Sequence, residues 1–493
     1  MGKYILSVDQ STQGTKGLLF DETCSLIARA DKPHRQIISE EGWVSHDLSE
    51  IRENTLEVCR KVVTKAGIEP KDILAMAISN QRETTCAWNK ETGNPVCDAV
   101  VWQCSRAKEI CESMTGQDAE MVLSKTGLTL SPYFPAAKMA WILRNIPDAR
   151  ELAEQNKLAF GTIDSWLVFS LCRDHPHKCD FSNAGRTELF DIRDLRWDPD
   201  LCRLFRIPAE CLPEVCMSDS CFGYTDLDGF LECPIPVHGV LGDSHGALLG
   251  HGGKEAGKLK ATYGTGSSVM MNIGSRPVFS QKGLVTSLAW GLDGTISYVL
   301  EGNLNYTGAV ISWLKKDVQL IEHEAQTQEL AMQADPHDRA YFIPAFSGLG
   351  APYWDSDATG MLTGVTRTTG KAEIVKACLE SIAYQITDLV MLMAQESGIG
   401  IPEMRVDGGP TANSYLMQFQ ADVADARVCI PQIQELSGMG AAIAAGCAVG
   451  LYQYEQTVSG LSYHCYEPQM DPRRREECRR GWKEAVSRVL IKP

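Results

Sequence analysis

The stretch Asp9-Gln10-Ser11-Thr12-Gln13-Gly14-Thr15-Lys16 decides the fold of this chain, together with its counterpart Thr262-Tyr263-Gly264-Thr265-Gly266-Ser267. Each stretch is a small polar turn that lies between two short apolar runs. Such runs on either side of a turn predict a strand, a turn and a second strand. Because both halves of the chain open in this way, we expect one architecture to occur twice, although the two sequences do not repeat closely.

A glycine-rich polar segment, 250–257, separates the two halves. A chain of 493 residues is too long for one hydrophobic core. Glycine and polar residues are typical of a connector, so we expect an N-terminal domain over 1–250 and a C-terminal domain over 251–493. In the first half, an apolar run at 73–78 predicts a buried strand whose carboxyl end carries 80–83. Open α/β sheets bind their ligands at such strand ends.

The composition is that of an ordinary globular protein, with 44% apolar and 22% charged residues. A net charge of -16, from 47 basic and 63 acidic residues, disfavours a general affinity for nucleic acid or anionic membranes. The chain opens MGKYILSVD without a signal-peptide stretch, and no run approaches the roughly 20 apolar residues of a membrane helix. We therefore expect a cytoplasmic protein with neither a nucleic-acid nor a membrane partner.

The cysteine count of 18 is high. A secreted disulfide framework would accompany a signal peptide, and a zinc site would show paired CxxC-type spacing. The nearest approach to a cluster is Cys211, Cys216 and Cys221, in a stretch without suitable histidine spacing. The pattern predicts reduced thiols that are mostly buried and act as small apolar residues.

The two polar turns are candidates for binding phosphate. Exposed N–H groups of β-turns form anion-binding nests, and the sequence has no Walker-type GxxxxGK[ST] loop to do that work. Either turn alone is weak evidence, because most such turns only connect strands, but two at corresponding places strengthen the case. A third candidate is the strand end at 405–409, whose glycine pair precedes Asn413 and lets a flat base approach the backbone.

Longer stretches carry a family resemblance. The chain resembles the FGGY carbohydrate kinases over nearly its whole length, and within them the glycerol kinase branch. The matching stretches, in the order of the family, are NQRETT at 80–85, VVWQC at 100–104, YFPAAKMAWILRN at 133–145, GTIDSWL at 161–167, ATYGTG at 261–266, GLGAPYWD at 348–355, LESIAYQ at 379–385 and VDGGPTANSYLMQFQAD at 406–422. This resemblance implies an α/β fold of two actin-like, ribonuclease H-like domains with the active site in the cleft between them.

The resemblance also implies ATP and Mg²⁺ as cofactors and a role for individual residues. Asp243 matches the general base, and Asp9 the carboxylate associated with Mg²⁺. Contacts to the nucleotide are implied for Thr12, Gln13, Lys16, Thr265, Gly266, Gly308, Ser312, Gly409 and Asn413. Contacts to the acceptor are implied for Arg82, Glu83, Trp102, Tyr133 and Asp243, with Ser244, His245 and Ser268 in the same region.

The sequence departs from glycerol kinases at three places. Those enzymes usually have arginine where this chain has Lys16, DQQ where it has 243–245, and phenylalanine where it has Ser268. Lysine keeps the charge but lacks the bidentate fork of arginine. Serines in place of glutamine and phenylalanine predict a roomier, more polar pocket, and polar partners select hydroxyl groups strongly. We therefore expect a C4–C5 polyol or ketose (xylulose-type) rather than glycerol, with His245 either lining that space or packing behind it.

Three alternatives stay open at this stage. The first is a true glycerol kinase that makes glycerol 3-phosphate. The second is an actin-like ATPase switch without a sugar acceptor, which would have no need of the cluster around Arg82, Glu83, Trp102 and Tyr133. The third is a family member that has lost catalysis and only binds sugar, against which intact Asp9 and Asp243 argue. The partner is a small polyol or sugar, and both a homodimer and a homotetramer are compatible with the sequence.

Overall fold

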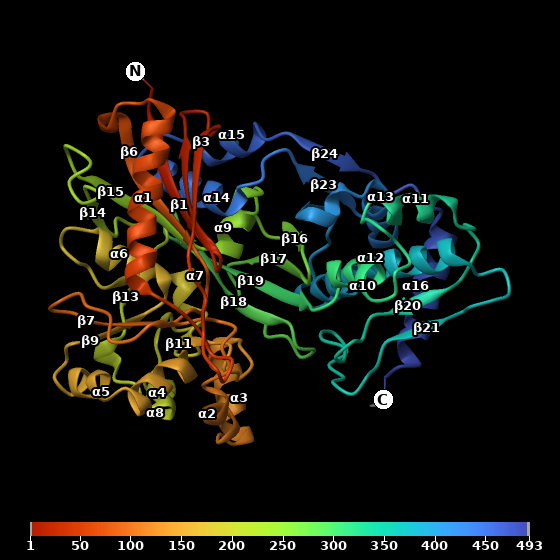
Figure 1. The fold of residues 1–493 in the computed structure, drawn as a ribbon, viewed down its shortest axis with the longest axis horizontal. Helices are drawn as coiled ribbons and strands as arrows, with labels where there is room; N and C mark the ends of the chain where they lie inside the picture. The colour runs from red at the N-terminus through yellow and green to blue at the C-terminus, as the bar shows by residue number, and fades with distance from the viewer. Residues whose placement is uncertain (1, 491–493) are drawn as a thin grey trace.

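The computed structural model describes residues 2–490, and its two largest sheets lie side by side (Figure 1). The first has six strands in the order β14-β15-β6-β1-β2-β3, and the second has seven in the order β18-β19-β17-β16-β22-β23-β24. The strands of the first sheet are β1 (Tyr4–Gln10), β2 (Gly14–Phe20), β3 (Leu26–Pro33), β6 (Ile73–Asn80), β14 (Gly223–Thr225) and β15 (Ile235–Gly242). Those of the second are β16 (Leu259–Tyr263), β17 (Ser267–Gly274), β18 (Val285–Leu292), β19 (Thr295–Leu304), β22 (Glu403–Asp407), β23 (Arg427–Pro431) and β24 (Tyr463–Tyr466).

The two sheets repeat one topology. In the first, β1 pairs antiparallel with β2 and parallel with β6, which pairs parallel with β15. In the second, β16 pairs antiparallel with β17 and parallel with β22, which pairs parallel with β23. The polar turns at 9–16 and 262–267 join the hairpins β1–β2 and β16–β17. The repeated architecture predicted from the two turns is therefore confirmed.

Helices cover both sheets, and one crosses from the second half to the first. Helix α1 (Leu48–Ala66) begins at the cap Asp47, whose carboxylate accepts from the backbone N–H of Ser49 and Glu50, and it packs on β2 and β3. Helices α12 (Lys371–Ser397), α13 (Ser414–Ala424) and α16 (Pro472–Ser487) belong to the second half. Helix α14 (Leu436–Ala448), drawn in blue in Figure 1, packs instead on β1, β6 and β15 and on α9 (Asp243–Gly250).

Shorter elements complete the chain. The remaining helices are α2 (Lys108–Glu112), α3 (Gly116–Thr126), α4 (Pro135–Asn145), α5 (Pro147–Glu154), α6 (Ile163–Leu171), α7 (Phe181–Ala184), α8 (Pro199–Phe205), α10 (Gly308–Lys316), α11 (Gln326–Gln333) and α15 (Tyr454–Ser459). The remaining strands are β4 (Ile37–Ile38), β5 (Val44–His46), β7 (Cys86–Asn89), β8 (Ala99–Val100), β9 (Leu158–Gly161), β10 (Lys178–Asp180), β11 (Phe190–Asp191), β12 (Arg196–Trp197), β13 (Glu214–Cys216), β20 (Tyr341–Ile343) and β21 (Met361–Thr363).

Helix α12 is an exception to the expectation that no segment is long and apolar enough to cross a membrane. Its length and its mean hydropathy of 1.3 over an 18-residue window would suffice to cross a membrane. However, 83% of that window is buried inside the protein, where α12 packs against α11 and α13. Core helices of this kind pass the same test of length and composition, so α12 is weak evidence for a membrane span.

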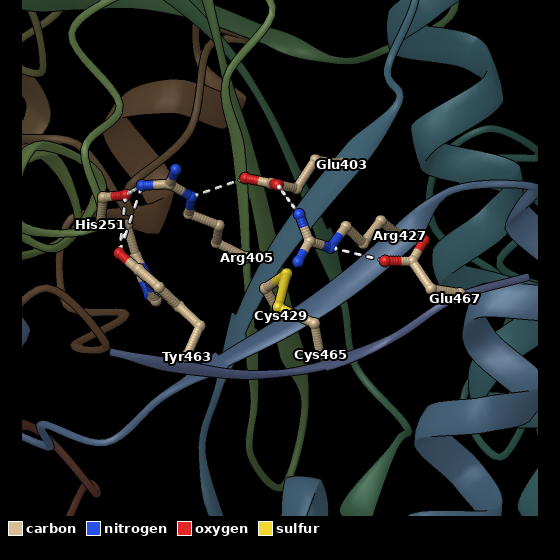
Figure 2. Close-up of a disulfide and its surroundings, with 8 residues drawn as sticks. All are labelled: His251, Glu403, Arg405, Arg427, Cys429, Tyr463, Cys465 and Glu467. Carbon is tan, nitrogen blue, oxygen red and sulfur yellow. Dashed lines mark hydrogen bonds and ion pairs between the residues drawn. A yellow bond between two sulfur atoms is a disulfide. The ribbon is translucent and has the colours of Figure 1, made fainter. Parts of the chain in front are cut away.

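One pair of cysteines corrects the expectation of free thiols. Cys429 in β23 and Cys465 in β24 form a disulfide (Figure 2). The two residues are 36 positions apart in the sequence, and the antiparallel register of β23 and β24 places them directly opposite each other. No local spacing signals this pairing, because it depends on how two distant strands align. The other cysteines of residues 2–490 are free, and most of them are buried, as expected.

Candidate active site

A cavity of about 940 Å³ opens between the two sheets. Residues of both halves line it, which places the cavity at the interface that the sequence predicted as a cleft. Among the candidate site residues, its lining includes Lys16, Asp243, Ser244, Ser268 and Gly409.

Parallel pairing explains why three candidate residues from distant parts of the chain gather at one edge of the first sheet, where one of them, Asp243, lines the cavity. Strands β1, β6 and β15 are neighbours and run in the same direction, with Gln10 opposite Asn80 and Asn80 opposite Gly242. Their carboxyl ends therefore meet at one edge of the sheet, where ligands collect in such sheets. This edge carries Asp9 in β1, Arg82 just after β6 and Asp243 just after β15.

Asp243 is the most accessible of these three side chains. It is the first residue of α9, its side chain is 38% exposed, and it lines the cavity. Its Oδ1 accepts a hydrogen bond of 2.6 Å from the backbone N–H of Ser244 and lies 3.4 Å from Nε of Arg82. A negative charge is stabilised at a helix N-terminus and beside a guanidinium group. The carboxylate is thus held in place and still open to a ligand.

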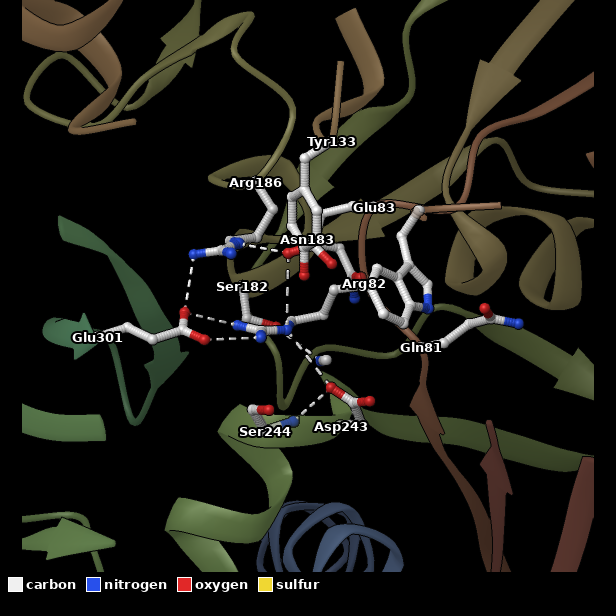
Figure 3. A network of polar contacts seen from close by, with 12 residues as sticks. Gln81, Arg82, Glu83, Tyr133, Ser182, Asn183, Arg186, Asp243, Ser244 and Glu301 are labelled. Carbon is white, nitrogen blue, oxygen red and sulfur yellow. Dashed lines mark hydrogen bonds and ion pairs between the residues drawn. The ribbon is translucent and has the colours of Figure 1, made fainter. Parts of the chain in front are cut away.

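Arg82 and Glu83 belong to a buried network of charges that also includes Arg186 and Glu301 (Figure 3). The guanidinium of Arg82 donates through Nη1 and Nη2 to the two carboxylate oxygens of Glu301, at 3.1 and 2.9 Å. Arg186 donates through Nε to Glu83 at 2.6 Å and through Nη1 to Glu301 at 2.9 Å. None of the four side chains is more than 7% exposed. The two arginines and two glutamates balance in charge.

Arg186 and Glu301 were not among the predicted site residues. The available signal was chemical: Glu301 is a lone charged residue in an otherwise apolar run, 298–302, that reads as a buried strand. A charge in such a strand is costly unless it is paired, so a partner could have been expected. The identity of that partner could not, because Glu301 lies 219 residues from Arg82 and 115 from Arg186.

An aromatic wall lies beside this network. The rings of Trp102 and Tyr133 pack edge to face with their centroids 5.5 Å apart, and Trp102 Nε1 donates to Thr12 Oγ1 at 2.9 Å. Behind them, the buried Lys138 Nζ donates to the main-chain carbonyl oxygens of Glu83 and Tyr133. Burial lowers the pKa of Lys138 to about 7, although Glu83 counteracts part of that effect. The structure therefore brings the four predicted acceptor residues Arg82, Glu83, Trp102 and Tyr133 together.

The turn at 9–16 is held by ion pairs. Lys16 Nζ lies 2.8 Å from Glu435 and 3.6 Å from Asp9, and Arg29 also pairs with Glu435. Burial raises the pKa of Asp9 to about 6, although Lys16 counteracts part of that effect. Gln13, at the tip of the turn, is exposed.

The turn at 262–267 packs against the start of α10. The backbone N–H of Gly308 donates to Gly264 O at 2.9 Å, and that of Ala309 donates to Thr265 O at 2.9 Å. Close contacts also explain the glycines here, because a Cβ atom at Gly266 would lie 2.3 Å from Leu304 O. The turn and the helix are therefore built as one unit, with Ser312 one turn further along α10.

Gly409 and Asn413 occupy the loop between β22 and α13. Asn413 caps α13 by accepting from the N–H of Leu416 at 3.0 Å, and its Nδ2 donates to Thr327 at 3.0 Å. Both ends of this amide are therefore occupied. Gly409, by contrast, has open space where a Cβ atom would lie.

His245 and Ser268 differ in their surroundings. His245 is fully buried, and within residues 2–490 neither of its ring nitrogens has a hydrogen-bond partner. Burial, reinforced by the charge of Arg82, holds the pKa of His245 well below its ordinary value, so the ring is neutral. Ser268 lines the cavity, and its hydroxyl is without a hydrogen-bond partner among the same residues.

Two buried carboxylates, Asp164 and Asp180, are linked by hydrogen bonds to the end of β15. Asp180 caps α7 by accepting from the backbone N–H of Ser182 and Asn183, each at 2.9 Å, and Ser182 Oγ in turn accepts from the N–H of Gly242 at 2.9 Å. The N–H of Asp180 donates to Asp164 Oδ2 at 3.3 Å, and both carboxylates are fully buried. The residue just before Asp243 is thus tied to this pair.

We expect Asp164→Asn to weaken the pH dependence of stability. Burial, followed by the charge of Asp180, raises the pKa of Asp164 to about 7 from an ordinary value of 3.8. Between these values the folded state keeps a proton that the unfolded state has released. The free energy of unfolding therefore falls as pH rises from about 4 to 7, by up to about 4 kcal/mol. Urea unfolding at pH 4.5, 6 and 8 should show the variant gaining on the wild type as pH rises. A difference that stays constant with pH would contradict this assignment.

Two ribonuclease H-like sheets that face one cleft, each with a hairpin turn at its edge, define an actin-like two-domain protein. The chain belongs to the FGGY family of carbohydrate kinases: the family's N-terminal domain model matches residues 4–250 and its C-terminal domain model matches 259–449. The protein is thus a kinase of this family, and the predicted fold class is confirmed.

Similar proteins point to one branch of the family. The chain is 46% identical over 490 residues to glycerol kinase 1 of Thermotoga maritima, covering 99% of each chain. It is 43% identical to a glycerol kinase of Caldanaerobacter subterraneus subsp. tengcongensis, again covering 99% of each. Its structure resembles the Plasmodium falciparum glycerol kinase with ADP, with a TM-score of 0.94 and 31% identity, covering 100% of this chain and 99% of that one. The resemblance to the glycerol kinase branch is confirmed.

These relatives overturn the expectation of a xylulose-type acceptor. The xylulose kinase of Lactobacillus acidophilus has a TM-score of 0.87 but only 20% identity, covering 98% of this chain and 97% of that one, so it shows the fold alone. The inference from sequence rested on Ser244 and Ser268, two side chains at the cavity. That inference gave the two serines more weight than the side chains of Arg82, Glu83, Trp102 and Tyr133, which lie together in the structure.

Proposed function

We propose that the protein transfers the terminal phosphoryl group of ATP to glycerol and so makes glycerol 3-phosphate. The observation that carries this proposal is the placement of Asp243, an accessible carboxylate at the cavity beside Arg82. Similarity over 99% of the chain to proteins named glycerol kinase supports the choice of acceptor.

In this proposal Asp243 is the general base. Phosphoryl transfer needs little covalent help from the protein, which supplies position and electrostatic stabilisation. Asp243 accepts the proton of the attacking hydroxyl as the oxygen bonds to the phosphorus atom, and the leaving group is the nucleoside diphosphate. The neighbouring cation, Arg82, donates to an adjacent hydroxyl, and Glu83 accepts from one. Trp102 and Tyr133 cover the apolar face of the acceptor.

The nucleotide lies, in this proposal, between the two hairpin turns. Thr12, Gln13, Lys16, Thr265 and Gly266 contact its phosphates, and Gly308, Ser312, Gly409 and Asn413 contact its nucleoside. We also propose that 1–250 and 251–493 act as two domains, the first carrying the acceptor site and the second most of the nucleotide site.

The side chains at the cleft are compatible with Mg²⁺. Within residues 2–490, no group of three or more His, Cys, Asp or Glu residues could hold a metal ion by itself. Mg²⁺ at kinase sites is usually held by one or two carboxylates together with substrate phosphates. Asp9, 7% exposed at the end of β1, would be such a carboxylate. When bound, the ion neutralises phosphate charge.

The test is to measure ADP release from ATP and Mg²⁺ with glycerol, with xylulose and without an acceptor. We expect turnover that depends on glycerol and a kcat/KM for glycerol at least 100-fold above that for xylulose. Turnover that is independent of any acceptor would favour an actin-like ATPase switch instead. A preference for xylulose would contradict the proposed acceptor.

A further inference from the structure

Glu301 lies where the two sheets meet. It belongs to β19 of the second sheet, whereas its partners Arg82 and Arg186 follow β6 and α7 of the first half. Its side chain is 1% exposed, and both of its carboxylate oxygens accept from a guanidinium group. Figure 3 shows this carboxylate reaching across to the two arginines from the opposite side to Asp243.

The ionisation of Glu301 follows from these contacts. Burial alone would raise its pKa, but the charges of Arg82 and Arg186 outweigh burial and hold the pKa well below its ordinary value. Removing one partner of a buried ion pair leaves the other charge uncompensated, which is strongly destabilising. Glu301 thus compensates both buried arginines together with Glu83, which lies 3.7 Å from Arg82 and 2.6 Å from Arg186.

The bidentate contact fixes the direction in which Arg82 donates. Its Nη1 and Nη2 face Glu301, so its Nε edge is turned toward the acceptor side, 3.4 Å from Asp243 and 3.7 Å from Glu83. A planar guanidinium that is held at two nitrogen atoms cannot rotate without breaking both hydrogen bonds. The orientation of the proposed hydroxyl donor is thus set from the second sheet.

Arg186 extends this control to Glu83. Its guanidinium donates through Nη1 to Glu301 at 2.9 Å and through Nε to Glu83 at 2.6 Å, and so links the two carboxylates. Glu83 itself has a φ of 62°, a conformation in which a non-glycine residue is held by its surroundings. One carboxylate therefore orients both adjacent acceptor residues, Arg82 directly and Glu83 through Arg186.

We propose that Glu301 is a positioning residue for the acceptor: a carboxylate of the second sheet that orients Arg82 and Glu83 of the first half. This inference rests on the proposed function, since it gives those two residues the acceptor contacts. It makes acceptor recognition depend on contact between the two halves of the protein, because neither half alone holds Arg82 in this orientation.

The test compares Glu301→Gln and Glu301→Asp with the wild type in steady-state kinetics with varied glycerol and varied ATP. Lys125→Met is a matched control, because it removes a partly buried ion pair to Asp198, at 2.6 Å, outside this network. We expect Glu301→Gln to raise the KM for glycerol at least 10-fold and to change the KM for ATP less than about 3-fold. Glu301→Asp should recover part of the loss, and ADP binding measured by calorimetry should stay within about 3-fold of the wild type.

Other outcomes separate this inference from the proposed function. Equal rises in both KM values, or a KM for glycerol that stays within 2-fold of the wild type, would overturn the positioning role while leaving the function intact. If both Glu301 variants failed to fold while the control folded, the network would serve stability alone. That result would also overturn the positioning role. A wild type without glycerol-dependent turnover would instead refute the proposed function itself.

Discussion

Asp243→Asn should reduce glycerol-dependent turnover by about 10² to 10⁴, the range that general acid–base catalysis contributes. Asparagine keeps the size of the side chain, and its Oδ1 still accepts from the N–H of Ser244 as Asp243 Oδ1 does at 2.6 Å. What is lost is the negative charge beside Arg82 and the ability to take a proton. The effect should appear in kcat, measured as ADP release at saturating ATP and glycerol.

Two further measurements make this result specific. ADP binding should change little, because the charge lost lies on the proposed acceptor side of the cavity. Asp293→Asn is the matched control, since this carboxylate is 68% exposed and pairs with Lys254 away from the acceptor residues. It should retain full activity. If Asp243→Asn kept a rate within a few-fold of the wild type, another group would have to take the proton and the mechanism would be wrong.

The strand end that carries Arg82 could be predicted for a local reason, whereas the roles of Asp9 and Asp243 came from the family resemblance. Asp9, Arg82 and Asp243 each follow or end a short apolar run, and parallel strands bring such ends to one edge. The cap of α1 at Asp47 is a local feature of the same kind, because capping depends on residues two or three positions away. Features of this kind can be read from a single sequence.

Features that depend on the alignment of distant segments could not be read in this way. The pairing of Cys429 with Cys465 requires the register of β23 and β24. The contact of Glu301 with Arg82 requires the meeting of the two sheets. Helix α14 packs on the first sheet although it lies near the end of the chain.

The acceptor was misjudged for a different reason. A pocket binds through all of its walls, so an argument from Ser244 and Ser268 alone neglects the side chains that do not differ. Ser268 lines the same cavity as Asp407 and Gly409, which belong to the second sheet and the loop that follows it. Its position is therefore as compatible with the nucleotide side of the cleft as with the acceptor side.

Gly408→Ala should cause the second large loss, at the proposed nucleotide site. Gly408 has a φ of 101°, which an L-residue rarely adopts, and a Cβ atom there would lie 1.9 Å from the carbonyl oxygen of Tyr263. Backbone on both sides would have to move, so the loop at 408–413 would separate from the turn at 262–267. A misplacement of about 1 Å can cost about 10²-fold in rate. We expect the kcat/KM for ATP to fall by about that factor, mainly through a higher KM for ATP.

A second glycine separates this local effect from a general loss of stability. Gly400→Ala introduces the same methyl group where nothing lies within 4 Å, and it should leave the KM for ATP unchanged. Calorimetry with ADP should show the loss of affinity in Gly408→Ala directly, whereas the KM for glycerol should stay within about 3-fold. If folded Gly408→Ala bound ADP with normal affinity, the turn at 262–267 and the loop at 408–413 would not bind the nucleotide jointly. The site would then have to lie along one hairpin turn alone, since Gly408 is the point at which the second turn and the loop before α13 touch.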